Sequence, residues 1–259
     1  RVCRNRTNKE HRNITPVWQM MKTVALDDLR ARIAVIEGGR NIAIRTVPLG
    51  APLIDAVLPG GGLMGAAVHE IAGSAASGFA AMVLGRLKGP VLWCVDLYAR
   101  SHLYGPGLAA FGIRSDQLII VRCANRADML WAMEEGLRTP ALAGIVCEPG
   151  GAVDLTASRR LQLAAEIGGG VGLLLNRGSL KKAGQLAPNA LASRWRVDNA
   201  PIVDEAGACG RSRWRVELER CRGAEAVGEW MVRWHEPDGR EQEKYGKTGR
   251  LCVDDAPVD

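Results

Sequence analysis

The sequence predicts an α/β fold in which a mainly parallel sheet is covered by helices on both faces and continues into antiparallel strands. From residue 46, apolar runs of strand length alternate with segments of helical spacing, as is typical of a buried parallel sheet. A glycine-containing loop joins one such strand to the next helix. After residue 193, polar and apolar residues alternate with period two, which is typical of antiparallel strands.

The individual elements follow from this periodicity. Parallel strands are expected at 67–72, 91–96, 118–122, 143–147 and 171–175. Helices are expected at 79–87, 108–111, 127–138 and 158–167, and in the third of these Leu130, Met133 and Leu137 share one face. Antiparallel strands are expected at 194–197, 212–220 and 229–235.

Composition divides the chain into four parts. Residues 1–21 form a basic leader, and 22–45 a short segment with an amphipathic helix at 26–37. Residues 46–235 form the core, and 236–259 a polar tail. The leader has two interpretations: a flexible basic arm for DNA, or sequence upstream of a start at Met20 or Met21.

The bulk composition excludes several classes of protein. No apolar run is long enough to span a bilayer and the N-terminus has no apolar signal core, so we expect a cytoplasmic protein with no membrane partner. The seven cysteines include no C-x-x-C pair, which favours reduced thiols over disulfides or a metal site. The net charge of +6 is compatible with a nucleic-acid partner.

The loop at residues 73–80 is the most informative motif. It keeps both glycines of the phosphate-binding pattern G-x-x-x-x-G-K-[ST], but Phe79 replaces the lysine and Ala80 replaces the hydroxyl residue. The candidate cofactor-binding positions are Gly73, Ser77, Gly78, Phe79 and Ala80. Three interpretations are open: Phe79 and Ala80 pack into the core, they form a recruitment surface, or the backbone alone binds ATP weakly.

The segments that precede this loop, at 49–50, 53–58, 59–63, 65 and 70–71, follow an order that resembles the RecA-like recombinase core, a P-loop NTPase fold. That resemblance places Tyr98 where the catalytic glutamate stands, Glu148 at the Walker B aspartate and Asn176 at the sensor glutamine. A phenol is a poor general base at neutral pH. The resemblance therefore implies a protein with no catalytic residues and no cofactor, in which ATP and Mg²⁺ enter only if hydrolysis has survived.

Within RecA relatives, segments 78–81, 89–94, 103–108, 131–135 and 219–223 resemble the ImuA family of the bacterial SOS response. The resemblance implies a non-catalytic accessory factor of error-prone translesion DNA synthesis. Its implied partners are ImuB, a polymerase-like protein, and through ImuB an error-prone C-family DNA polymerase. RecA and DNA are left open as further partners, with recruitment to the nucleoid in the latter case.

Two basic or aromatic regions are candidate contact surfaces. Arg177, Lys181 and Lys182 follow a strand end in a glycine-containing loop, which suits DNA phosphates or simply a solvated loop. Trp230, Trp234 and Arg233 are candidates for partner binding, because Trp and Arg are favoured at interfaces. The alternative is that the tryptophans fill the core and the arginine faces solvent.

Two other functions compete with the accessory-factor hypothesis. The intact glycines and the carboxylate of Glu148 are also compatible with a divergent, DNA-stimulated P-loop ATPase. An SOS-induced inhibitor of cell division is the third hypothesis, although it leaves the RecA-like core without a purpose.

Overall fold

The computed structural model describes residues 46–99, 103–176, 188–201, 212–224, 227–235 and 249–254, all within one compact unit, Ile44–Asp259. The expected leader 1–21 and the segment 22–45 lie outside the described residues. So do Arg177, Lys181 and Lys182, the DNA-contact candidates.

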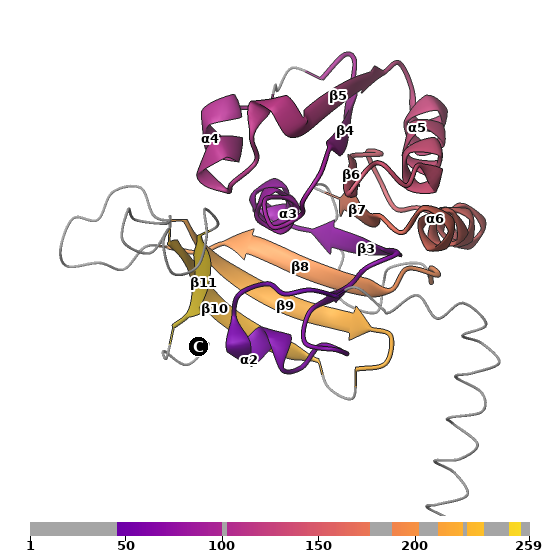
Figure 1. Ribbon diagram of the computed structural model, residues 1–259. Coiled ribbons are helices and arrows are strands. Elements are labelled where there is room, and N and C mark those ends of the chain that lie inside the picture. The colour runs from indigo at the N-terminus through magenta and orange to yellow at the C-terminus, as the bar shows by residue number, and fades with distance from the viewer. Residues whose placement is uncertain are drawn as a thin grey trace, which may run out of the picture. The chain divides into compact units, whose positions relative to one another are not determined.

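Among the described residues, a nine-stranded sheet organises the fold, with strand order β11-β10-β9-β8-β3-β7-β6-β4-β5 (Figure 1). The strands from β8 to β5 in this order are parallel, and β9, β10 and β11 add antiparallel to the edge of β8. Their bounds are β3 Ala67–Ala72, β4 Val91–Asp96, β5 Leu118–Cys123, β6 Gly144–Cys147, β7 Val171–Asn176, β8 Ser193–Asn199, β9 Arg213–Cys221, β10 Gly228–His235 and β11 Arg250–Val253. A separate pair joins β1 Thr46–Val47 to β2 Leu63–Met64.

Helices cover both faces of the parallel strands, which confirms the predicted α/β class. The helical elements are α2 Pro52–Asp55, α3 Ala76–Leu84, α4 Gly105–Ala110, the 3-10 turn η1 Ser115–Gln117, α5 Arg126–Arg138 and α6 Leu155–Gly168. Figure 1 shows α5 and α6 together on one side of β6 and β7, with α3 on the other. None of the described helices combines the length and the apolar character needed to cross a membrane.

The two faces have separate cores of different character. On the α3 face, the buried side chains include Phe79, Trp93, Trp195 and Trp214. On the α5 and α6 face, the core is mostly aliphatic, with methionine and cysteine. The two long helices begin with polar caps, because the side chains of Asn125 and Asp154 accept from backbone N–H groups in the first turn.

The structure corrects several local predictions, and α3, α4 and α6 each begin three residues before their expected starts. The strand at β8 pairs antiparallel to β9, as its alternating pattern predicts, but it pairs parallel to β3 on its other side, which the pattern does not predict. The alternation reflects burial, since Trp195 lies in the core while Arg196 lies on the charged face. Helix α3 begins at Ala76, three residues before the expected start at 79. Within the expected polar tail, Arg250–Val253 forms β11 and pairs with β10.

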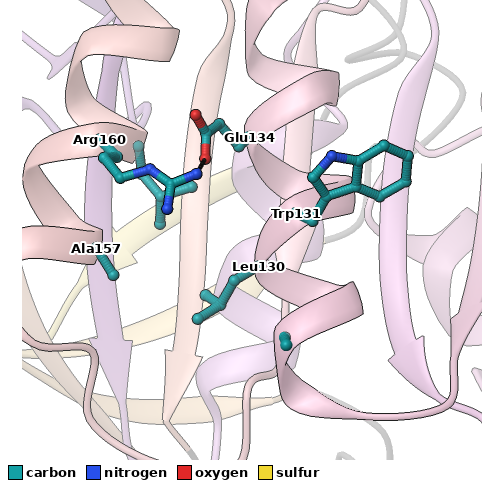
Figure 2. A pocket seen from close by; sticks show the side chains of 7 residues that line it. Leu130, Trp131, Glu134, Ala157 and Arg160 are labelled. Atoms are coloured by element: carbon teal, nitrogen blue, oxygen red, sulfur yellow. Dashed lines mark hydrogen bonds and ion pairs between the residues drawn. The ribbon is translucent and has the colours of Figure 1, made fainter.

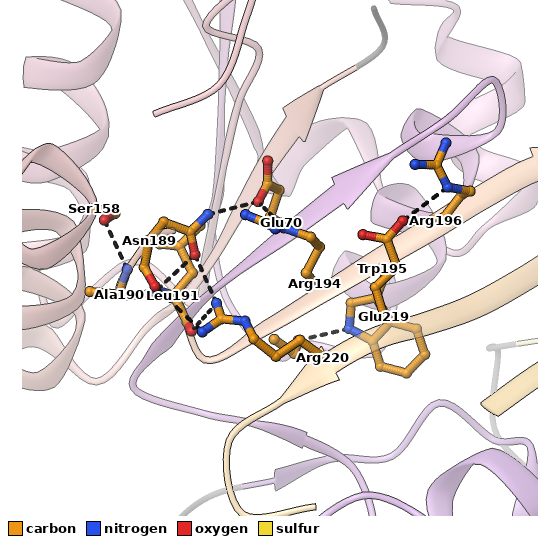
Figure 3. A network of polar contacts seen from close by, with 11 residues as sticks. Glu70, Ser158, Asn189, Ala190, Leu191, Arg194, Trp195, Arg196, Glu219 and Arg220 are labelled. Carbon is orange, nitrogen blue, oxygen red and sulfur yellow. Dashed lines mark hydrogen bonds and ion pairs between the residues drawn. The ribbon is translucent and has the colours of Figure 1, made fainter. Parts of the chain in front are cut away.

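The sheet face opposite α3 carries a network of ion pairs where β3 meets β8 (Figure 3). Glu70 on β3 accepts from Arg194 Nε at 2.7 Å and from Asn189 Nδ2 at 2.8 Å. Arg220 on β9 donates in turn to Asn189 Oδ1 at 2.8 Å. Because Glu70 is only 4 % exposed, its charge requires these partners. They therefore fix the parallel β3–β8 pairing that brings β8 against the glycine loop.

Candidate functional site

The glycine loop leaves β3 at the carboxyl edge of the parallel strands. Gly73, directly after β3, has a φ of +107°, a backbone conformation that residues with a side chain rarely adopt. A Cβ at this position would lie 2.3 Å from the carbonyl oxygen of Val197 on β8. Glycine therefore lets the loop pass directly against the end of β8.

The first N–H groups of the loop donate to acceptors on β8. In a phosphate-binding loop the backbone N–H groups point at the anion. Here the Ser74 N–H donates to Asp198 Oδ1 at 2.8 Å, and the Ala75 N–H donates to the Val197 carbonyl at 3.0 Å. The Ser74 hydroxyl donates to the same Asp198 oxygen at 3.1 Å and accepts from the Asn199 N–H at 2.9 Å. A carboxylate of the chain itself thus takes donors of this loop.

Two further N–H groups of the loop are used within it. The Ala76 N–H donates to the Gly73 carbonyl at 3.3 Å, and the Phe79 N–H donates to the Ala75 carbonyl at 3.0 Å. Because α3 already begins at Ala76, the second half of the motif is helical. The loop keeps the two glycines of a nucleotide site but satisfies these donors internally.

The side chains that replace the lysine and the hydroxyl residue lie in the core. Phe79 and Ala80 are both 0 % exposed, as the core-packing interpretation predicts. The Phe79 ring lies 5.7 Å from the Trp195 ring and 6.4 Å from the Trp214 ring, measured between centroids. A Cβ on Gly78 would lie 3.0 Å from the Trp214 ring. The aromatic cluster therefore occupies the space around position 79, so a charged lysine there would lie among aromatic rings.

The strand ends that the RecA resemblance singles out meet at one edge of the sheet. The strands β3, β7, β6 and β4 are adjacent and parallel, so Asn176 at the end of β7, Glu148 after β6 and Tyr98 after β4 lie at neighbouring strand ends. Glu148 Oε1 accepts from the indole Nε1 of Trp93 at 3.1 Å. Tyr98 is 75 % exposed, and Asn176 is buried. The arrangement matches a RecA-like edge, but its surviving carboxylate is bound by an indole.

Behind the loop, a chain of hydrogen bonds crosses the buried interior. His69 Nδ1 lies 2.6 Å from Ser193 Oγ, and His69 Nε2 lies 2.8 Å from the Met64 carbonyl oxygen. The Trp195 indole N–H donates to the same Ser193 oxygen at 2.7 Å. Burial is the main cause that lowers the pKa of His69 from 6.5 to about 4. His69 is therefore neutral at physiological pH and serves the fold.

Three buried thiols gather where β4, β5 and β6 end, and none suits nucleophilic chemistry. Desolvation raises the pKa of Cys94 to about 12, and it also raises the pKa of Cys123 and Cys147. A thiol must lose its proton to act as a nucleophile, so these groups are inert at neutral pH. In the described part of the chain, no group of three or more His, Cys, Asp or Glu side chains is placed to hold a metal ion.

The tryptophans proposed for partner binding lie beside the same aromatic cluster. Trp234 is 4 % exposed and its ring lies 5.2 Å from that of Phe111, which corrects its assignment to a contact surface. The alternation on β10 turns this ring inward. Trp230 is half-buried against the core, and Arg233 lies 3.8 Å from the Asp254 carboxylate, so their role in partner binding stays a prediction.

The hydrogen bonds that the loop makes with β8 could not be predicted from the loop motif alone. Asp198 lies 124 residues after Ser74 and one residue beyond the strand expected at 194–197. Only the parallel pairing of β8 with β3 brings the two together. No local pattern in the sequence signals the parallel pairing of β8 with β3, because the alternation of β8 predicts an antiparallel strand.

Comparison with known proteins gives a consistent result. No family model matches the chain. Two curated proteins, each named Protein ImuA, come from Caulobacter vibrioides strains NA1000 / CB15N and ATCC 19089 / CIP 103742 / CB 15. Each is 36% identical over 221 residues, a match that covers 78% of this chain and 88% of the relative. With this identity, this coverage and a RecA-like α/β fold, the chain belongs to the ImuA family.

Proposed function

We propose that the chain is a non-catalytic accessory factor of SOS-induced, error-prone translesion DNA synthesis, and that it acts by protein contact. One observation carries the proposal: the Ser74 and Ala75 N–H groups donate to Asp198 and Val197 of the chain itself, and the buried Phe79 and Ala80 stand at the positions of the lysine and the hydroxyl residue. Membership of the ImuA family supports the setting in a mutagenesis system. Its first partner is ImuB, and through ImuB an error-prone C-family polymerase.

The chemistry of phosphoryl transfer argues for the same conclusion. Transfer needs positive charge or Mg²⁺ to stabilise the developing negative charge and a group that positions the attacking water. At the aligned positions this chain has the buried Phe79 and Ala80 and the exposed Tyr98. We therefore propose that the protein works without ATP or another cofactor. We place it in the cytoplasm, with RecA and DNA as its secondary partners.

The divergent ATPase is the competing function, because Glu148 keeps a carboxylate at the strand end and both glycines of the loop remain. Calorimetric titration with ATP, with and without Mg²⁺, and a phosphate-release assay with and without DNA separate the two. The accessory-factor proposal expects no binding and no release above background. DNA-stimulated release that disappears in Gly78→Asp would overturn it.

The partner is tested separately by co-purification of the full chain with ImuB from the same cell. The proposal expects a stable complex whose yield does not depend on added ATP. A chain that fails to retain ImuB, with correct folding shown by circular dichroism, contradicts the proposed partner.

A further inference from the structure

A groove between α5 and α6 forms an open cavity on the face opposite the glycine loop's helix. Its volume is about 230 Å³, and its apolar lining includes Leu130 and Trp131 from α5 with Ala157 and Leu161 from α6. Figure 2 shows the side chains of both helices around it, with Trp131 projecting from the outer side of α5. Trp131 is 63 % exposed, which is unusual for the residue type that loses most by facing water.

The size of the groove suits an anchoring side chain. Small-molecule sites usually measure about 300–1,000 Å³. At about 230 Å³ this groove is smaller, and its walls are mostly apolar. One branched or aromatic side chain of a partner protein fits such a space, with the Trp131 ring covering its neighbours. The groove thus has the features of a central contact in a protein interface.

Charge at the end of the groove defines the partner further. Glu134 accepts from Arg138 Nη2 at 2.7 Å and from Arg160 Nη2 at 2.6 Å, so two guanidinium groups share one carboxylate. Glu135 lies 4.0 Å from Arg138 Nε and offsets that cation, while Arg160 remains 63 % exposed at its side chain. Arginine has five N–H donors in a planar fork, so Arg160 can still bind a second carboxylate.

We propose that this groove, lined by Trp131 and ended by Arg160, is the docking site for a partner segment that presents an apolar side chain next to a carboxylate. On a partner helix these two side chains would be three or four positions apart. The inference rests on the proposed function, since it assigns to this groove the contact with ImuB. The partner's apolar side chain enters between α5 and α6, and its carboxylate binds Arg160.

The test measures the affinity of purified ImuB for the full chain and its variants by calorimetry. Trp131→Ala should weaken binding by at least about thirtyfold, and Arg160→Glu by about tenfold. Tyr104→Ala is the matched aromatic control, because Tyr104 is 72 % exposed on the opposite face. Arg114→Glu is the matched charge control, because Arg114 is 69 % exposed and ion-paired with Asp116. Both controls should stay within about twofold of the parent chain.

The outcomes separate this inference from the proposed function. If the parent chain does not bind ImuB, the proposed partner is wrong and the docking assignment falls with it. If the parent binds and Trp131→Ala binds equally well, the groove assignment alone is overturned. Sedimentation of the same variants tests whether the groove instead joins two copies of this chain. A loss of self-association with unchanged ImuB affinity would make the groove an interface between copies, which also overturns it.

Discussion

The glycine loop and the α5–α6 groove differ in what their polar groups and aromatic rings contact. In the loop, the Ser74 N–H donates to Asp198, and Phe79 is 0 % exposed among tryptophans. In the groove, Trp131 and Arg160 face solvent beside an open cavity. In the loop, the N–H groups of Ser74 and Ala75 have acceptors within the chain, while the groove on the other face is open to solvent. A retained fold therefore does not locate the functional site.

Restoring the lysine of the loop should have the largest effect. Phe79→Lys places an ammonium group among the rings of Trp195 and Trp214 without a buried acid to pair with it among the residues described around it. We expect a loss of more than about 4 kcal/mol in the free energy of unfolding, measured by guanidinium denaturation. The control Phe79→Leu should lose about 1.5 kcal/mol. A stable Phe79→Lys protein that binds ATP would show that the loop is open.

A methyl group at Gly73 should have the next largest effect. It would meet the Val197 carbonyl oxygen at 2.3 Å, so the loop must separate from β8. We expect Gly73→Ala to cost about 3 kcal/mol of unfolding free energy in thermal denaturation. Gly150→Ala is the matched control, because Gly150 has a φ of +70° but no atom within 4 Å of the added Cβ. Gly150→Ala should lower the free energy of unfolding by about 1–2 kcal/mol, which is the cost of the left-handed backbone conformation without a steric clash. Equal losses would mean that the loop does not press on β8.

Acid should weaken the interior behind the loop by a smaller amount. The pKa of His69 is lowered from 6.5 to about 4, so the unfolded chain takes up the proton more readily than the folded one. The stability due to neutral His69 is present above pH 6.5 and is lost as the pH falls toward 4. Between about pH 7 and about pH 5 the loss is about 2 kcal/mol, from roughly 1.36 kcal/mol per pKa unit. His69→Gln should lack this part of the pH dependence.

An NMR titration of the His69 ring reads the same quantity directly. A ring that titrates near its ordinary pKa of 6.5 would contradict the account of a buried, neutral histidine.

Shortening Trp131 should have the smallest effect on stability. Its side chain is 63 % exposed, so Trp131→Ala should change the free energy of unfolding by about 0.5 kcal/mol or less. Thermal denaturation of Trp131→Ala and Phe79→Leu under the same conditions compares the loss of stability at the two aromatic positions. A loss of several kcal/mol in Trp131→Ala would show that this ring supports the fold and would remove the reason to regard it as a contact residue.

Much of the fold could be predicted because its strongest signals are local. The strand at β4 was expected at 91–96 and is observed at Val91–Asp96, since a strand buried on both faces reads as a continuous apolar run. The helices α3 and α6 both begin three residues before their expected starts; Ala75 before α3 has no capping side chain, whereas Asp154 before α6 is a cap that periodicity alone does not register. The antiparallel pairing of β8 with β9 agrees with its alternating pattern, but its parallel pairing with β3 could not be predicted, because period-two alternation reports burial and not strand direction.

The site could be predicted only in part. The loss of lysine and hydroxyl at Phe79 and Ala80 is visible in the sequence, and their burial follows from ordinary packing. The contact of Asp198 with the loop joins segments 124 residues apart, so it needs the sheet topology. Trp131 gave a weak signal, since it stands beside the apolar stripe of Leu130, Met133 and Leu137 and not on it. Only the packing of α6 against α5 makes a groove at that position.

The most direct test of the central claim is one calorimetric titration of the full chain with ImuB, carried out with and without saturating ATP and Mg²⁺. The account predicts binding of the same affinity in both conditions and no heat from nucleotide alone, because the donors of Ser74 and Ala75 have acceptors on β8. An affinity that changes with nucleotide, together with ATP binding to the parent chain that Gly78→Asp abolishes, would contradict it.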